Sequence, residues 1–136
     1  MNILFVCKWN RFRSKAAEGI FNKVNDNSEV TAKSGGLFPD VPVSEDIITA
    51  GEAIRVTISK DQNGLPHELL MWSDYIIVVA DDVPVVIFDD LVNNDGKKVL
   101  HWKIRDIQGS NVDQRKETMV EIDRHIVSLL RDCDNL

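Results

Sequence analysis

Hydrophobic residues along this chain form short apolar runs that alternate with segments of helical period. Runs rich in Val and Ile are typical of buried parallel strands, whereas apolar residues three and four apart are typical of amphipathic helices. The runs predict strands at Ile3–Val6, Glu29–Ala32, Tyr75–Ala80 and Lys98–Trp102. The helical periods predict helices from Ser14 or Lys15 to Val24, from Ser44 to near Gly51, from Pro66 through Trp72, over Val85–Phe88, and from Ser110 into the C-terminal region. Residues 54–58 alternate apolar and polar side chains and are expected to be extended. Strands separated by helices predict a parallel sheet with right-handed crossovers.

Composition indicates an ordinary globular protein. The 136 residues suit one domain spanning 1–136, with 43% hydrophobic and 28% charged residues. The net charge of −6 argues against general nucleic-acid binding and against an anionic membrane surface. No apolar run approaches the length of a membrane span, and the first run is too short for a signal peptide.

Cysteine and histidine usage points to a reduced, metal-free protein. The two cysteines, Cys7 and Cys133, stand at opposite ends of the sequence and form no disulfide framework, so a cytoplasmic setting fits best. His67, His101 and His125 are scattered and show no metal-ligand spacing. We expect no metal and no cofactor, and structural roles for His125 and Cys133. His67 could face a site, although a solvated or capping role is the common one for such a residue.

The first 24 residues combine a strand, a cationic loop and a helix, MNILFVCKWNRFRSKAAEGIFNKV. This layout directs backbone N–H groups and a helix N-terminus toward an anion. Cys7 ends the strand, and the N–H groups, the helix and Arg13 would all favour its nucleophilic thiolate form. Arg13 can bind two phosphate oxygens, Ser14 can donate to the sulfur, and Asn10 tolerates a left-handed backbone. The alternative is that Cys7 is a small buried hydrophobe at a strand end.

At these residues the chain resembles the low-molecular-weight protein tyrosine phosphatase family, which also includes thioredoxin-coupled arsenate reductases. The shared pattern is Cys7-Lys-Trp-Asn-Arg-Phe-Arg13-Ser14, directly after the first strand. The resemblance implies an α/β, flavodoxin-like three-layer sandwich, in which a four-stranded parallel sheet of order 2-1-3-4 carries helices on both faces. It also implies that Lys8, Trp9, Asn10, Arg11, Phe12 and Ser14 form a phosphate-binding loop around Cys7 and Arg13.

Two loop positions depart from the family pattern. Trp9 stands where the family has Gly, and it must either wall the pocket or point away from it. Phe12 stands where tyrosine phosphatases carry a second Cys, so the protective disulfide is lost. Lys8 and Arg11 make the mouth more cationic than a plain phosphotyrosine pocket requires.

A phosphatase needs an acid to protonate the leaving oxygen. The family uses an Asp-Pro pair after the fourth strand, and Asp106 occupies the matching position, followed by Ile107 instead of Pro. The alternative is that Asp106 pairs with Arg105 or Arg115 on a surface loop. Asp81 and Asp82, after the third strand, are expected to form a helix N-cap with Pro84 in the first turn, and they are next in line as acids.

The resemblance implies a metal-free phosphatase that hydrolyses phosphomonoesters through phosphocysteine, with Cys7, Arg13 and Asp106 as catalytic residues. Its partners would be a phosphorylated protein, with phosphotyrosine one possibility, or a small phosphate ester, and the loop would bind inorganic phosphate or another oxyanion. Phosphoarginine stays open as well. Two other functions also stay open: a phosphate- or phosphoprotein-binding module without turnover, and an arsenate reductase-like protein that uses an external thiol. A phosphocysteine carrier is disfavoured because it does not need Arg13.

Overall fold

The computed structural model describes residues 1–134, although the side chain of Cys133, expected to be structural, lies outside the described part. A central parallel sheet is formed by four strands: β1 (Asn2–Cys7), β2 (Thr31–Gly36), β3 (Tyr75–Val79) and β4 (Lys98–Trp102). The helices are α1 (Arg13–Val24), α2 (Glu45–Ala53), α3 (His67–Trp72), the 3-10 helix η1 (Val85–Phe88), α4 (Asp89–Asp95) and α5 (Val112–Asp134).

The strand order is β2-β1-β3-β4, and all three neighbouring pairs are parallel. The predicted order is therefore confirmed. In the register, Cys7 lies opposite Gly36, and Val6 lies opposite Val78. Because β1 is flanked on both sides, its apolar residues are fully buried, as the continuous apolar run indicated.

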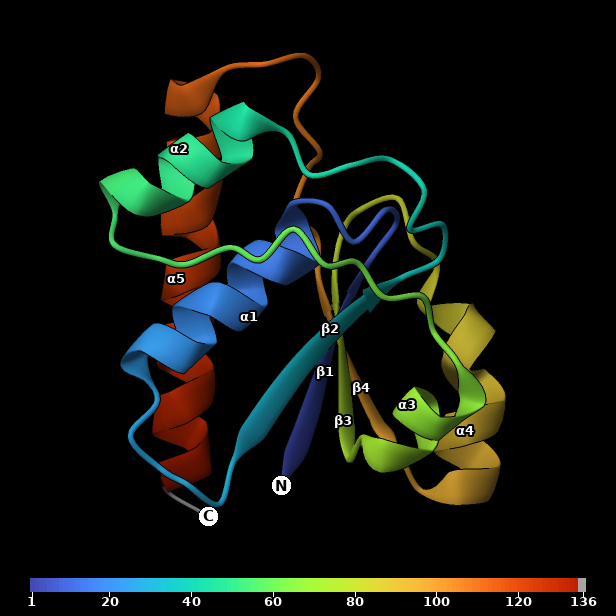
Figure 1. The fold of residues 1–136 in the computed structure, drawn as a ribbon. Coiled ribbons are helices and arrows are strands. Elements are labelled where there is room, and N and C mark those ends of the chain that lie inside the picture. Colours follow the sequence, from blue (N-terminus) through green and yellow to red (C-terminus); the bar gives the residue numbers. More distant parts are fainter. Residues whose placement is uncertain (135–136) are drawn as a thin grey trace.

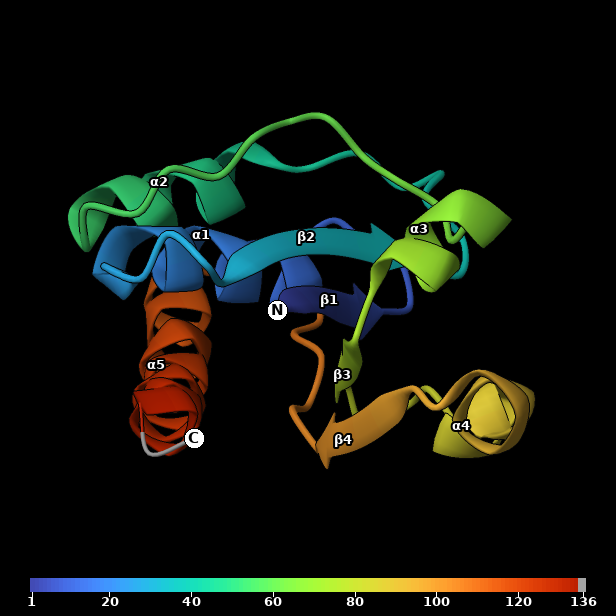
Figure 2. The same ribbon diagram turned by 90° about the horizontal axis from the view of Figure 1, so that it is seen from below.

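Helices cover both faces of the sheet (Figures 1 and 2). On one face, α1, α2 and α5 pack over Ile3 and Phe5 of β1. On the other face, α3, η1 and α4 pack over Leu4 and Val6. The alternation of β1 side chains thus divides the core between two layers, and the flavodoxin-like arrangement implied by the resemblance is confirmed.

Several element boundaries differ from the sequence prediction. The second strand begins at Thr31 and continues to Gly36, because it pairs with the whole of β1. Residues 54–58 join no strand; Arg55 adopts a left-handed backbone and the segment packs beside α1 instead. Helix α4 was not predicted, and Gly96 ends it with a φ of 66°.

Two predicted helix caps are wrong. Asn111, not Ser110, precedes α5, and its Oδ1 accepts the backbone N–H of Gln114 at 3.0 Å. Asp81 and Asp82 cap no helix; their carboxylates pair with Arg13. Val24, at the end of the first predicted helix, is exposed although it is apolar.

The fold brings three strand ends to one edge of the sheet. The loops after β1, β3 and β4 all begin at this carboxyl edge, the usual position of sites in open α/β sheets. Within residues 1–134, no helix is both long enough and apolar enough to cross a membrane.

Candidate active site

The loop between β1 and α1 leaves its backbone N–H groups free. Within the described part of the chain, none of the backbone N–H groups of residues 8–13 donates a hydrogen bond to another protein group. The helix α1 has Phe12 at its N-cap, without a capping side chain and without an acidic residue in its first turn. A helix N-terminus left open in this way attracts negative charge.

Cys7 lies at the base of this loop. It ends β1, only 2% of its surface is exposed, and its Sγ lies 3.0 Å from Ser14 Oγ. The Ser14 hydroxyl can donate to a sulfur anion at this distance. Cys7 is thus held at the start of the loop, with a hydrogen-bond donor beside the sulfur.

Asn10 fixes the shape of the loop, and its predicted left-handed backbone is confirmed by a φ of 48°. The side chain is fully buried, and its Nδ2 donates to Ser14 Oγ at 2.8 Å and to Ser34 Oγ at 3.1 Å. Its Oδ1 accepts the backbone N–H of Asn63 at 2.8 Å. Gly36 permits the close approach, because a Cβ there would stand 2.5 Å from the Asn10 nitrogen.

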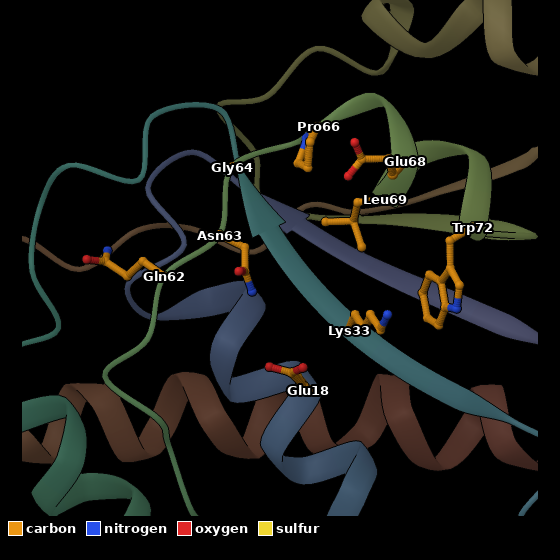
Figure 3. Close-up of a pocket in the computed structure, with 9 residues that line it drawn as sticks. All are labelled: Glu18, Lys33, Gln62, Asn63, Gly64, Pro66, Glu68, Leu69 and Trp72. Carbon is orange, nitrogen blue, oxygen red and sulfur yellow. The ribbon is translucent and has the colours of Figure 1, made fainter.

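The hydrogen bonds of the loop continue to the edge of β2. Ser34 Oγ donates to Glu18 Oε1 at 2.9 Å, and Gln62 Nε2 donates to the carbonyl groups of Trp9 and Asn10 at 3.3 Å. Glu18, Gln62 and Asn63 also line a cavity of about 760 Å³ beside β2 and α3 (Figure 3). The segment around residues 61–64 therefore holds the loop in place through hydrogen bonds to Trp9 and Asn10. The sequence carries no motif that marks this segment as part of a site.

Arg13 lies among three carboxylates. Its guanidinium is 1% exposed and donates from Nη1 to the Ile104 carbonyl at 3.0 Å. Its Nη2 lies 2.9 Å from Asp82 Oδ1. Asp81 and Asp106 each come within 3.7 Å. The charge of Arg13 is therefore shared between the strand ends of β3 and β4.

Asp106 lies on the loop after β4, at the rim of the site. Its side chain is 25% exposed, Oδ2 lies 3.7 Å from Arg13 Nη2, and Oδ1 accepts the Ile107 N–H at 2.9 Å. The structure gives it no ion pair with Arg105 or Arg115, and Arg115 pairs with Asp46 instead. Asp106, Asp81 and Asp82 share a groove of about 470 Å³, and the remaining lining residues are Arg105, Ile107, Gln108 and Gln114.

The remaining loop side chains take different directions. Lys8 Nζ lies 4.9 Å from the ring centre of Trp9, and Trp9 packs on the exposed ring of Phe38 at 5.9 Å. Arg11 Nε donates to the Pro42 carbonyl at 3.0 Å. Burial lowers the pKa of Arg11, and the nearby charge of Arg115 lowers it further. Phe12 points into the core and is buried.

The three histidines occupy three different parts of the fold. His67 is exposed in the first turn of α3, the His101 ring bonds to the Ala80 carbonyl at 2.7 Å, and His125 stacks on Trp102 at 4.9 Å. Among the side chains that the structure describes, those of residues 1–132, no group of three His, Cys, Asp or Glu is arranged to hold a metal ion.

Comparison with known proteins shows the family of the chain. The family model described as low molecular weight phosphotyrosine protein phosphatase matches residues 2–132. No curated protein sequence matches the chain significantly.

Solved structures share the fold over nearly the whole chain. The low molecular weight protein tyrosine phosphatase of T. tengcongensis is 26% identical, with a TM-score of 0.79 and 97% of this chain and 99% of that chain covered. The YwlE arginine phosphatase of Geobacillus stearothermophilus is 19% identical, with a TM-score of 0.79 and coverages of 98% and 93%. An arsenate reductase of Archaeoglobus fulgidus is 22% identical, with a TM-score of 0.75 and coverages of 93% and 97%. Together with the family match, these findings show that the chain belongs to the low molecular weight phosphotyrosine protein phosphatase family.

Proposed function

We propose that this protein is a metal-free, cysteine-dependent phosphatase that hydrolyses phosphomonoesters through a phosphocysteine intermediate. The observation that carries the proposal is the unpartnered run of backbone N–H groups between Cys7 and Arg13, which forms a binding surface for the three non-bridging oxygens of a phosphate. Arg13 adds a guanidinium to the same surface. These groups supply the charge stabilisation for which other phosphatases use metal ions.

In the first step, the Cys7 sulfur attacks phosphorus in line with the ester oxygen. The S–P bond forms as the P–O bond breaks, and the proton of the Asp106 carboxyl group moves to the departing oxygen. The loop N–H groups and Arg13 bind the charge that gathers on the non-bridging oxygens. The products of this step are a free alcohol or phenol and phosphocysteine.

In the second step, water attacks the phosphocysteine. Asp106, now a carboxylate, takes a proton from this water as its oxygen bonds to phosphorus and the S–P bond breaks. Inorganic phosphate leaves, and the electron pair of the broken bond returns to sulfur. The Ser14 hydroxyl, 3.0 Å from the sulfur, stabilises the thiolate as it departs.

Protein phosphotyrosine is the substrate that we place first. Trp9 and Phe38 form an aromatic pair beside the loop, and a phenyl ring can stack on such a surface. Because Cys7 must be reduced to react, we place the reaction in the cytoplasm. A Trp9→Ala variant tests the stacking, because it should weaken binding of aryl phosphates more than binding of alkyl phosphates, and equal losses would contradict the assignment.

The proposed function is tested by hydrolysis of para-nitrophenyl phosphate in the presence of EDTA. Wild type should turn over, Cys7→Ser should be inactive, and Asp106→Asn should lose about 100-fold or more, the usual contribution of a general acid. Asp132→Asn, an exposed aspartate on α5, is the matched control and should be unaffected. Full activity in Asp106→Asn would move the acid to Asp81 or Asp82. An inactive wild type that still binds vanadate would indicate a binding module instead.

A further inference from the structure

Arg115, in the first turn of α5, joins three segments of the site region. Its side chain is 1% exposed, and Nε donates to Asp46 Oδ2 of α2 at 2.9 Å. Nη2 donates to the Gly109 carbonyl at 3.1 Å. The guanidinium also stacks over the Phe12 ring, with Cζ 4.5 Å from the ring centre. One buried arginine thus contacts the loop of Cys7, helix α2 and the loop of Asp106.

The contact with Gly109 fastens the backbone of the acid loop, which we define as residues 105–110. Within the described part of the chain, the Arg115–Gly109 bond is the only hydrogen bond that ties the backbone of this loop to another segment. The other bond in the loop joins Asp106 to its neighbour Ile107. The loop has no regular secondary structure, so its conformation depends on few contacts.

Through its contact with Phe12, Arg115 also connects the acid loop with the loop that follows the nucleophile Cys7. Phe12 immediately precedes Arg13, is buried, and forms the N-cap of α1. Arg115 therefore bonds to the acid loop on one side and packs on the phosphate-binding loop on the other. A shift of Arg115 would change the distance between Asp106 and the substrate oxygen.

A purely structural role explains Arg115 poorly. Its Nη1 is the one buried side-chain nitrogen or oxygen of the described residues that has no hydrogen-bond partner. A buried ion pair can often be replaced by apolar side chains without loss of stability, and an orphaned donor adds a cost that such a replacement avoids. The two remaining donors and the planar face are the features that fix three segments together.

We propose that Arg115 is a positioning residue, which holds the acid loop against the phosphate-binding loop so that Asp106 reaches the leaving oxygen. This inference rests on the proposed phosphatase function. It assigns Arg115 an effect on proton donation alone and not on phosphate binding or on attack by sulfur.

Substrates with different leaving groups distinguish an effect on proton donation from an effect on phosphate binding or on attack by sulfur. Dinitrophenolate departs without a proton, whereas phenolate from phenyl phosphate needs one. The values of kcat/KM, which include the steps through attack by Cys7, are measured for both substrates in Arg115→Lys and in the matched control Arg124→Lys, an exposed arginine on the same helix. Lysine keeps a charge beside Asp46 but cannot also reach Gly109 and cover Phe12.

In Arg115→Lys we expect kcat/KM to fall by about tenfold or more for phenyl phosphate and by less than about twofold for dinitrophenyl phosphate. Arg124→Lys should leave both unchanged. The ratio of the two substrates is independent of how much enzyme is folded, so partial misfolding cannot imitate the result. Equal losses for both substrates, or no loss, would overturn the proposal. A wild type inactive on both substrates would instead refute the proposed function, and the inference with it.

A second variant and a second measurement guard against failure of the first. Arg115→Met combined with Asp46→Leu removes both charges, so neither is left buried alone, and it should show the same change in the substrate ratio. Hydrogen exchange of the amides of residues 105–110 should be faster in both variants than in wild type, whatever their activity. Unchanged exchange in these amides would contradict the anchoring role.

Discussion

Replacing Asn10 tests whether this residue shapes the phosphate-binding loop. The side chain makes three hydrogen bonds with no exposure to solvent, and the backbone φ is 48°. Asn10→Gly removes the side chain but accepts the left-handed backbone, whereas Asn10→Ala removes the side chain and resists that backbone. The two variants therefore separate the hydrogen bonds from the conformation.

Three buried hydrogen bonds at about 1 kcal/mol each predict that Asn10→Gly lowers the free energy of unfolding by about 3 kcal/mol. A left-handed backbone costs Ala about 1–2 kcal/mol, and about 0.4–1 kcal/mol of this is offset because Ala restricts the unfolded chain more than Gly does. Asn10→Ala should therefore be less stable than Asn10→Gly by about 1 kcal/mol. Both proteins should still fold, since domains are commonly stable by about 5–15 kcal/mol.

The assay is urea unfolding followed by tryptophan fluorescence, together with vanadate binding. Asn94, an exposed residue of α4, is the matched control, because in a helix the order reverses and Ala is more stable than Gly by about 1 kcal/mol. Vanadate affinity should fall by about tenfold or more in both Asn10 variants, since the loop loses its bonds to β2 and to Asn63. Equal stability of the two Asn10 variants, or vanadate binding at the wild-type level, would refute the role given to Asn10.

Three further substitutions test the surroundings of the loop. Gly36→Ala places a Cβ 2.5 Å from the Asn10 nitrogen, so the loop should shift and KM should rise. An unchanged KM would show that the loop can move without loss of substrate binding. Asp82→Asn removes a carboxylate that competes with phosphate for Arg13. Phosphate should therefore inhibit the variant about threefold to tenfold more strongly at low salt, and the difference should be smaller at high salt. Weaker inhibition would show that Asp82 mainly orients the guanidinium. Burial opposes ionisation of Asp46, but hydrogen bonds from Ser44 and Arg115 hold its pKa below the ordinary 3.8. The ionised Asp46 therefore stabilises the folded protein above pH 3.8, and this stabilisation disappears as the pH falls through the lower pKa of the folded state. Asp46→Asn should lack it, which the free energy of unfolding of both proteins, measured as a function of pH, would show.

The local part of the site could be predicted from the sequence. Strand, loop and helix follow one another within the first 24 residues, and the left-handed position of Asn10 follows from residue type and place in the loop. The sheet order followed from the family resemblance, because apolar runs identify strands but do not state which strands are neighbours. Local signals were therefore sufficient for the loop, and the resemblance was needed for the topology.

Contacts between distant segments could not be predicted in this way. Asp82 and Arg13 are 69 positions apart, and so are Arg115 and Asp46. An aspartate after a strand is equally compatible with a helix cap and with an ion pair, and only the fold decides which group it meets. The sequence offered Arg115 only as a partner for Asp106, because its contacts with Asp46, Gly109 and Phe12 depend on how the chain folds.

The carboxylates around Arg13 balance the charge of its buried guanidinium. A buried guanidinium without a counterion would be costly, and Asp82 supplies one at 2.9 Å while the Ile104 carbonyl satisfies Nη1. A phosphate that reaches Arg13 must then share the guanidinium with Asp82, which weakens binding but keeps the donors in place beforehand. Asp106, farther away at 3.7 Å, is not needed as the counterion, which leaves it free for the proton transfer that we propose. Two aspartates on neighbouring strand ends can thus divide the two tasks, one balancing the charge of Arg13 and the other serving the leaving group.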